Sequence, residues 1–212
     1  MARPVLYVLA GVNGAGKSSI GGHLLERAGS TWFNPDTFAR ELKAATGCEQ
    51  EAANAHAWQE GMRRLDEALE KGLNHAFETT LGGNTVAAKI LQATQTHDVL
   101  IWFCGLSSPE LHIARVKARV AAGGHLIAEE RIRERYPHAQ HNLIKLMPHV
   151  AYIQVYDNSM EADADGTVPD PVLVLEMENG HVIRPGHDEL EALQRAPEWT
   201  KPILEAALRG GA

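Results

Sequence analysis

The chain has 212 residues, of which 44% are apolar and 22% are charged, a composition typical of a single soluble globular domain. Its formal net charge of −7 argues against a broadly basic surface that would hold nucleic acid nonspecifically. Only Cys48 and Cys104 are present, which excludes a disulfide framework, and the apolar run around Cys104 predicts a buried, reduced thiol. No apolar run approaches the roughly 20 residues of a membrane span, so we expect a cytoplasmic protein without membrane contact.

Strands and helices are predicted to alternate from the start of the chain. A continuous apolar run at residues 5–10 predicts a strand that is buried on both faces. A glycine-rich turn then leads into a helix at about residues 17–28. A short second strand is expected at residues 31–34, and a long helix at residues 49–71 ends where Gly72 stands.

The second half of the chain continues this alternation. The elements expected there are a strand at 76–80, a helix at 84–94, a strand at 99–105, charged helices at 110–121 and 129–135, and a strand at 152–156. The pair Asn179-Gly180 predicts a hairpin between strands at 172–177 and 181–184, and a short helix closes the chain. We therefore expect one domain, residues 1–212, with a parallel five-stranded sheet between helical layers and a C-terminal hairpin and helix at about 171–209.

The strongest motif is GVNGAGKSS, which fits the phosphate-binding pattern G-x-x-x-x-G-K-[ST] between a strand and a helix. Glycines let the backbone wrap closely around a phosphate, and the helix N-terminus adds the positive end of its dipole. In such a loop Lys17 reaches the β- and γ-phosphates, and the Ser18 hydroxyl can ligate Mg²⁺. The candidate nucleotide-binding residues are Gly11, Asn13, Gly14, Ala15, Gly16, Lys17, Ser18 and Ser19. The motif predicts binding of ATP with Mg²⁺ and does not identify an acceptor.

Asp36 is the candidate general base. It lies in FNPDTFAR, at the end of the predicted second strand, and the carboxyl ends of parallel strands line the ligand crevice. A carboxylate there could take the proton of an attacking hydroxyl. The alternative is that Asp36 caps the helix running on to Lys43, with Pro35 fixing the approach. Arg40, at the end of the same segment, is a candidate substrate-binding residue.

The segment FETTLGG ends the third predicted strand in the same way. Glu78, Thr79 and Thr80 would then present polar groups to the crevice and could bind the substrate. The alternative is an ordinary strand end followed by a loop.

Residues 115–136 read RVKARVAAGGHLIAEERIRERY, which predicts two basic helices hinged at Gly123-Gly124 and forming a lid. Arginines on such a lid could neutralise charge on the transferred phosphoryl group and exclude water. The candidates are Arg119, Arg131, Arg133 and Arg135. The alternative is a solvated helix surface, because glutamates stand among the arginines at helical spacing. We expect at least one of these arginines to act on the triphosphate.

Together these segments, with the strand end VYDNS, resemble the zeta-toxin-like P-loop kinases over roughly residues 5–159, and the GGH lid resembles a compact branch of that family. The resemblance implies a P-loop kinase-type α/β/α fold and transfer from ATP, with Mg²⁺, to the 3′-hydroxyl of the amino-sugar in UDP-N-acetylglucosamine. It implies that Asp36 is the catalytic aspartate and Lys17 the P-loop lysine. It also implies that Glu78 with Thr79 or Thr80 contacts the substrate. The arginines that contact the triphosphate would be Arg119 and either Arg131 or Arg135.

The chain departs from the best-known toxins in being shorter and in having reduced substrate-binding elements, and relatives in the superfamily phosphorylate other hydroxyls. We therefore expect an ATP-dependent phosphotransferase acting on a small-molecule hydroxyl, with a nucleotide sugar as the first candidate. Two alternatives remain: a nucleotide-dependent switch or ATPase acting on a protein partner, and a nucleic-acid end kinase, which would need a basic track leading to Asp36. A single chain does not identify an antitoxin partner.

Overall fold

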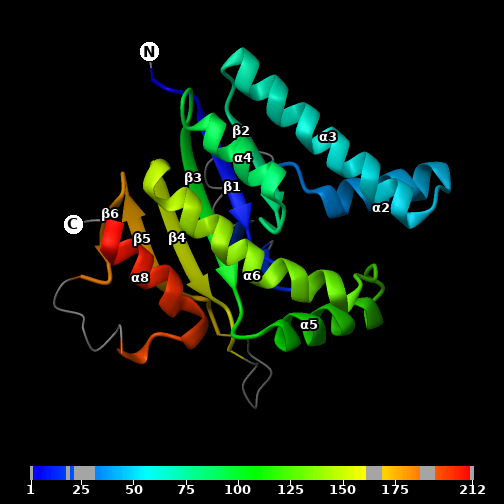
Figure 1. The fold of residues 1–212 in the computed structure, drawn as a ribbon. Helices are drawn as coiled ribbons and strands as arrows, with labels where there is room; N and C mark the ends of the chain where they lie inside the picture. The colour runs from blue at the N-terminus through cyan, green and yellow to red at the C-terminus, as the bar shows by residue number, and fades with distance from the viewer. Residues whose placement is uncertain (1, 18–19, 22–31, 161–168, 187–193, 211–212) are drawn as a thin grey trace.

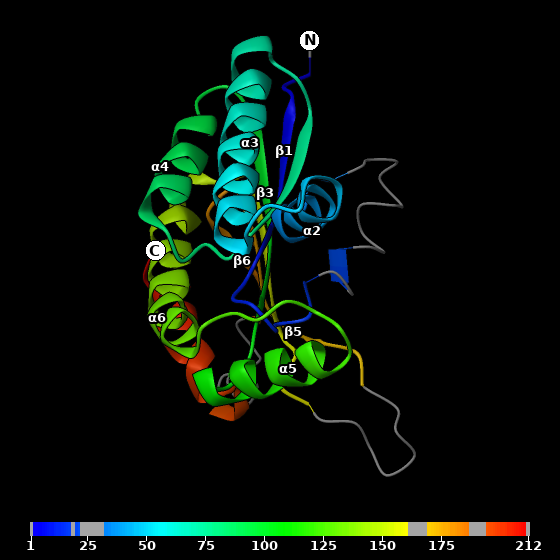
Figure 2. The same cartoon turned by 90° about the vertical axis from the view of Figure 1, so that its right-hand side faces the viewer.

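The computed structural model shows a six-stranded sheet with helices on both of its faces (Figures 1 and 2). The structure describes residues 2–17, 20–21, 32–160, 169–186 and 194–210. The strands are β1 (Val5–Ala10), β2 (His75–Thr79), β3 (Asp98–Gly105), β4 (Tyr152–Asp157), β5 (Val172–Glu178) and β6 (His181–Arg184). The helices are α2 (Pro35–Thr46), α3 (Gln50–Lys71), α4 (Asn84–Ala93), α5 (Pro109–Ala121), α6 (Glu129–Leu146) and α8 (Lys201–Gly210), with short 3-10 helices η1 (Met147–His149) and η2 (Glu198–Thr200).

The order of strands in the sheet is β2-β1-β3-β4-β5-β6. The first four of these strands are parallel, and β5 and β6 form an antiparallel hairpin that extends the same sheet from β4. The expected hairpin is confirmed, and its turn residues Asn179 and Gly180 have φ of 49° and 80°, as a two-residue hairpin turn requires. The sheet has six strands and not five: four are parallel, and the hairpin joins the same sheet through β4 and places Leu175 and Met177 in the shared core.

The missing parallel strand is the one expected at residues 31–34. Phe33 forms only an isolated bridge with Phe77, through one hydrogen bond to Ala76 and one from Glu78. Pairing stops after this single residue because Pro35 already begins α2 and carries no N–H donor. Most of the helix expected at residues 17–28 lies outside the described residues, although Lys17, Ile20 and Gly21 are helical.

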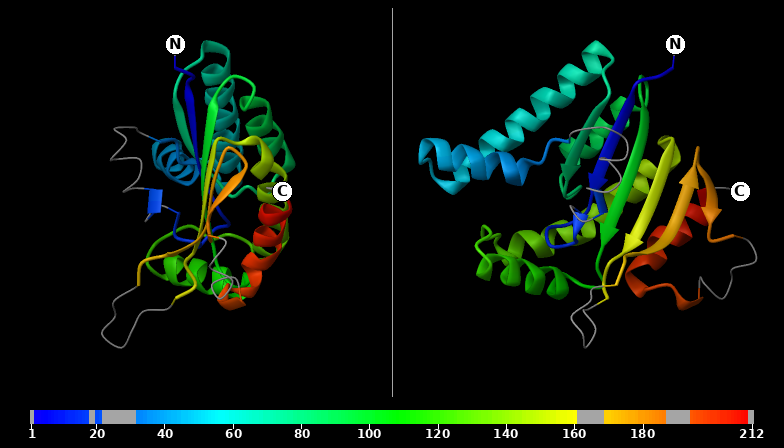
Figure 3. Two further views of the ribbon diagram at one scale, coloured as in Figure 1. Left: turned by 90° about the vertical axis from the view of Figure 1, so that its left-hand side faces the viewer. Right: turned by 180° about the vertical axis from the view of Figure 1, so that it is seen from behind.

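The helices α4, α6 and α8 cover one face of the sheet, and α2 and α3 pack on each other beyond the β2 edge (Figures 2 and 3). α5 lies beyond the carboxyl ends of the parallel strands (Figure 1). The second lid helix is longer than expected, because α6 continues through Pro137 to Leu146 instead of ending near Arg135. Pro137 removes one helical hydrogen bond, but the residues after it bury Ala139 and Leu143 in the core, which offsets that loss.

The segment of residues 115–136 is anchored to the core at both ends. Val116 of α5 and Ile132 of α6 belong to the main hydrophobic cluster, and Ile132 is fully buried. Only the connection of residues 122–128 lacks helical structure, and Gly123 has a φ of 91° where α5 ends. Among the described helices, none is long and apolar enough to cross a membrane.

The C-terminal segment packs against the end of β3. A Cβ built on Gly105 would lie 2.3 Å from Cη2 of Trp199, which is itself buried. We therefore expect Gly105→Ala to lower the free energy of unfolding by about 1–3 kcal/mol, because the indole must shift in a packed core. Urea unfolding measures this. Gly186→Ala is the control, since nothing lies within 4 Å of its Cβ position, and equal stability of the two variants would contradict the expectation.

Candidate functional site

The glycine-rich loop after β1 is held to the body of the protein through its carbonyl groups. Nδ1 of His112 lies 2.9 Å from the carbonyl oxygen of Asn13. The carbonyl oxygen of Ala15 accepts from Nδ2 of Asn158 at 2.8 Å and from the thiol of Cys104 at 2.9 Å. Cys104 is a buried free thiol, as expected, and burial raises its pKa to about 12. The loop is therefore fixed from α5, from β3 and from the end of β4.

Lys17 and Glu78 form a buried ion pair at the floor of the site. Lys17 Nζ lies 3.3 Å from Glu78 Oε1, and both side chains are less than 10% exposed. The other carboxylate oxygen of Glu78 accepts from Nδ2 of Asn34 at 2.9 Å. Asn34 in turn accepts, through Oδ1, from the backbone N–H of Asp36 at 2.9 Å. A continuous polar chain thus joins the loop lysine to the first turn of α2, which carries Asp36.

The N-cap of α2 is Asn34, not Asp36. Its side chain accepts from the backbone N–H groups of Asp36 and Thr37, so the alternative of Asp36 as the capping residue is wrong. Asn34 occupies the N-cap position because Pro35 fills the first helical position directly after it. The Asp36 carboxylate is left 40% exposed, and it is not used to cap the helix.

Two basic side chains from the segment of residues 115–136 approach the Asp36 carboxylate. Arg119 Nη1 lies 4.0 Å from Oδ2, and His125 Nε2 lies 3.7 Å from Oδ1. Within the described part of the chain, Nε and Nη2 of Arg119 are buried without a hydrogen-bond partner. A guanidinium with spare donors beside a carboxylate can interact with an anionic group that enters the site.

The remaining candidate arginines occupy three different environments. Arg135 is half-buried and donates from Nη1 to Oδ1 of Asn13 at 2.7 Å, which brings α6 onto the loop. Burial lowers the pKa of Arg135 from its usual value, and the nearby charge of Arg131 adds to this effect. Arg131 itself is exposed, and Arg133 is exposed and paired with Glu110 at 2.5 Å. The structure therefore brings Arg119 and Arg135 to the site, and leaves Arg131 at its edge.

The other predicted site residues are less closely engaged. The hydroxyls of Thr79 and Thr80 accept from the backbone N–H groups of Leu81 and Gly82, at 3.0 and 3.4 Å, and so shape the turn after β2. Arg40 is exposed on α2. The predicted nucleotide-binding residues Ser18 and Ser19, including the Mg²⁺ ligand Ser18, lie outside the described residues.

Sequence reasoning missed the contacts of His112, Asn158 and His125. His112 stands within α5 as a lone histidine on a helix, and Asn158 lies in the strand end VYDNS, which contributed to the family resemblance but predicted no contact with the loop. Their partners lie 99 and 143 residues away in the chain, so no local pattern could reveal them. His125 belongs to the GGH segment, which was named with VYDNS among the segments that carry the resemblance.

Burial of His112 makes the stability of the fold sensitive to acid. Burial, together with the charges of Lys17 and Arg115, lowers the pKa of His112 to about 4, against a partly compensating hydrogen bond to Asn13. Because the folded pKa lies below the ordinary value of about 6.5, the unfolded chain binds more protons between these values, and stability falls as the pH falls. We expect this one group to account for a loss on the order of 3 kcal/mol between pH 7 and pH 4.

Urea unfolding of the wild type and of His112→Asn across this pH range measures the effect, because all other titrating groups are shared. We expect the wild type to lose more stability than the variant. Parallel curves would show that His112 titrates normally.

Comparisons with known proteins agree with this architecture. The family model described as Zeta toxin matches residues 1–164. A protein from Haemophilus influenzae is 27% identical over 144 residues, which cover 64% of this chain and all of that protein.

Two solved structures share the fold. One is described as the AvrRxo1-ORF1:-ORF2 complex with ATP, with a TM-score of 0.65, 16% identity and 93% of this chain covered, and this chain spans 65% of its length. The other is described as the PezAT chromosomal toxin-antitoxin system of Streptococcus pneumoniae, with a TM-score of 0.58 and 17% identity, and the match covers 97% of this chain and 88% of that one. Since the family model covers most of the sequence, the chain belongs to the zeta toxin family.

Proposed function

We propose that this protein is an ATP-dependent phosphotransferase that transfers the γ-phosphate to a hydroxyl of a small molecule. The observation that carries the proposal is the polar chain from Lys17 through Glu78 and Asn34 to Asp36, since it joins the loop lysine to a partly exposed carboxylate that does not cap its helix. Membership of the zeta toxin family and the ATP in the AvrRxo1 structure support it.

In the proposed reaction the Asp36 carboxylate accepts the proton of the acceptor hydroxyl as its oxygen forms a bond to the γ-phosphorus. The bond between the γ-phosphorus and the bridging oxygen breaks, and ADP leaves with that oxygen. Lys17 binds the β- and γ-phosphates, and Arg119 and Arg135 stabilise the migrating group, with Arg131 as a further contributor at the edge. Glu78, Thr79, Thr80 and Arg40 are proposed to hold the acceptor.

Mg²⁺ is the proposed cofactor. The donors available near Lys17 are oxygens: the Ser18 hydroxyl, from the sequence motif, and the Glu78 carboxylate, which suits a hard cation that also binds phosphate and water. When bound, the ion would neutralise charge on the phosphates.

The acceptor class is the finer part of the proposal. We name a nucleotide sugar, with UDP-N-acetylglucosamine first, on the family resemblance. The test is ATP turnover with a panel of sugar nucleotides, sugars and short oligonucleotides, with products resolved by mass spectrometry. A product heavier by one phosphate supports the kinase and names its acceptor. Loss of ATP without any phosphorylated product favours a nucleotide-dependent switch, and a labelled oligonucleotide end favours the nucleic-acid kinase.

A toxic role with an antitoxin partner is a separate proposal, motivated by the described system of the pneumococcal relative. Growth of cells after induced expression of the wild type and of Asp36→Asn tests it. Growth arrest by the wild type alone would support it, and equal growth would count against it.

A further inference from the structure

The carbonyl groups of the glycine-rich loop point into the protein. His112 contacts the carbonyl oxygen of Asn13, and Asn158 donates to the carbonyl oxygen of Ala15, in each case from a side chain that is less than 10% exposed. These two peptide units also carry the N–H groups of Gly14 and Gly16. In a planar trans peptide the N–H points away from the C=O. The N–H groups of Gly14 and Gly16 must therefore point away from the core.

The glycines make this orientation available at low conformational cost. Gly14 and Gly16 have φ of 85° and 87°, in the region that favours glycine. Gly16 also packs closely on its anchor, since a Cβ there would lie 2.4 Å from Nδ2 of Asn158. Alternate N–H groups that point the same way form a concave site for an anion. His112 at the Asn13 carbonyl, and Asn158 together with the Cys104 thiol at the Ala15 carbonyl, therefore decide where the loop presents its N–H donors.

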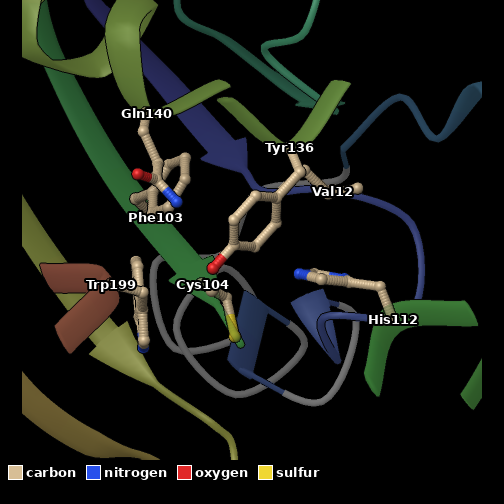
Figure 4. A pocket seen from close by; sticks show the side chains of 8 residues that line it. Val12, Phe103, Cys104, His112, Tyr136, Gln140 and Trp199 are labelled. Atoms are coloured by element: carbon tan, nitrogen blue, oxygen red, sulfur yellow. The ribbon is translucent and has the colours of Figure 1, made fainter. Parts of the chain in front are cut away.

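The tautomer of His112 follows from its partner. A carbonyl oxygen only accepts, so Nδ1 of His112 must carry the proton, and Nε2 is then a bare acceptor. Within the described residues Nε2 is buried without a partner, and the ring tip faces a small cavity beside Tyr136 (Figure 4). The Tyr136 hydroxyl does not serve it, because it lies 3.1 Å from the carbonyl oxygen of Leu106, to which it donates. A buried imidazole with one unsatisfied nitrogen is unfavourable if the side chain only fills space. We therefore infer that His112 contributes mainly through its Nδ1–H donor.

Asn158 is anchored as firmly as His112. Its backbone N–H donates to the carbonyl oxygen of Gly105 at 3.0 Å. The preceding Asp157 is buried and accepts from Nε1 of Trp199 at 3.0 Å. The end of β4 and the C-terminal segment thereby hold the Asn158 side-chain amide in place, and this amide holds the Ala15 carbonyl of the loop.

We propose that His112 and Asn158 are positioning residues for triphosphate binding: they orient the peptide units that present the N–H groups of Gly14 and Gly16 to the phosphates. The inference rests on the proposed function, in which this loop binds ATP. Neither side chain contacts the nucleotide. Each acts through a loop carbonyl.

The test is calorimetric titration of the purified full-length protein with ATP and Mg²⁺. We expect His112→Leu and Asn158→Ala each to weaken ATP binding by roughly five- to tenfold, the size of one lost hydrogen bond. His112→Asn should bind ATP within about twofold of the wild type, because Asn Nδ2 can take the place of His Nδ1. In turnover assays the loss should appear in the KM for ATP and not in kcat.

The matched control is His97→Leu. His97 is also buried and its ring contacts a backbone carbonyl, that of Leu73 at 3.2 Å, far from the loop along the chain. We expect this variant to lose stability in thermal unfolding and to keep its affinity for ATP. Equal loss of affinity in His97→Leu, or an equal loss in His112→Asn and His112→Leu, would show that the effect is general destabilisation and overturn the inference.

Two other outcomes separate the inference from the function on which it rests. A wild-type protein that binds no ATP would remove the proposed function itself. A wild-type protein that binds ATP, with unchanged affinity in both His112→Leu and Asn158→Ala, would leave the function standing and overturn the positioning roles.

Discussion

Replacing Asp36 by asparagine is expected to lower kcat for phosphotransfer by about 10²–10⁴-fold, the contribution typical of a positioned general base. Asparagine keeps the size of the side chain and cannot take a proton from the acceptor hydroxyl. Affinity for ATP should stay close to that of the wild type, because the lysine and the loop that we propose to bind phosphate are untouched. Initial rates with the acceptor identified by mass spectrometry, and calorimetry with ATP, measure the two quantities.

The fold should tolerate this change. Asn34, not Asp36, caps α2, so the variant loses a favourable interaction with the helix dipole, worth about 0.3–1 kcal/mol, and the partly exposed charge contacts with Arg119 and His125. Glu41→Gln removes an exposed carboxylate from the same helix and serves as the matched control, with unchanged turnover. A variant Asp36→Asn that transfers phosphate at the wild-type rate would remove Asp36 from the mechanism.

Replacing Lys17 by alanine is expected to damage both nucleotide binding and turnover. In the proposed reaction the ammonium acts directly on the phosphates, so kcat/KM should fall by about 10²–10³-fold and ATP should bind more weakly. Stability should fall as well, since Glu78 loses the cation that lies 3.3 Å from it in a buried site. Removing one partner of a buried ion pair is destabilising.

The double variant Lys17→Ala with Glu78→Gln separates the two effects. Glutamine can still accept from Asn34 and carries no charge that needs a partner. We expect the double variant to recover most of the lost stability in urea unfolding, with no recovery of turnover. Recovery of turnover would mean that Lys17 serves the fold and not the phosphates.

Much of the architecture could be predicted from local patterns. The apolar runs that became β1 and β3, the stop of α3 at Gly72 and the Asn179-Gly180 turn were all identified correctly. These features depend on residues within a few positions of one another. The expected strand at 31–34 was wrong because Pro35 begins α2 directly after Asn34. The expected end of α6 was wrong because the residues after Pro137 are buried in the core.

The candidate site likewise has features that follow from local sequence and features that depend on tertiary contacts. A contiguous motif was enough to predict a phosphate-binding loop with Lys17, and a strand-end position was enough to propose Asp36 and Glu78 as site residues. Only packing paired Glu78 with Lys17 and made Arg135, not Arg131, the neighbour of the loop. No local sequence pattern around His112 or Asn158 predicts their hydrogen bonds to loop carbonyls 99 and 143 residues away. Such contacts exist only after the sheet brings the ends of β1, β3 and β4 together, because a hydrogen bond depends on distance and direction in space and not on separation in sequence.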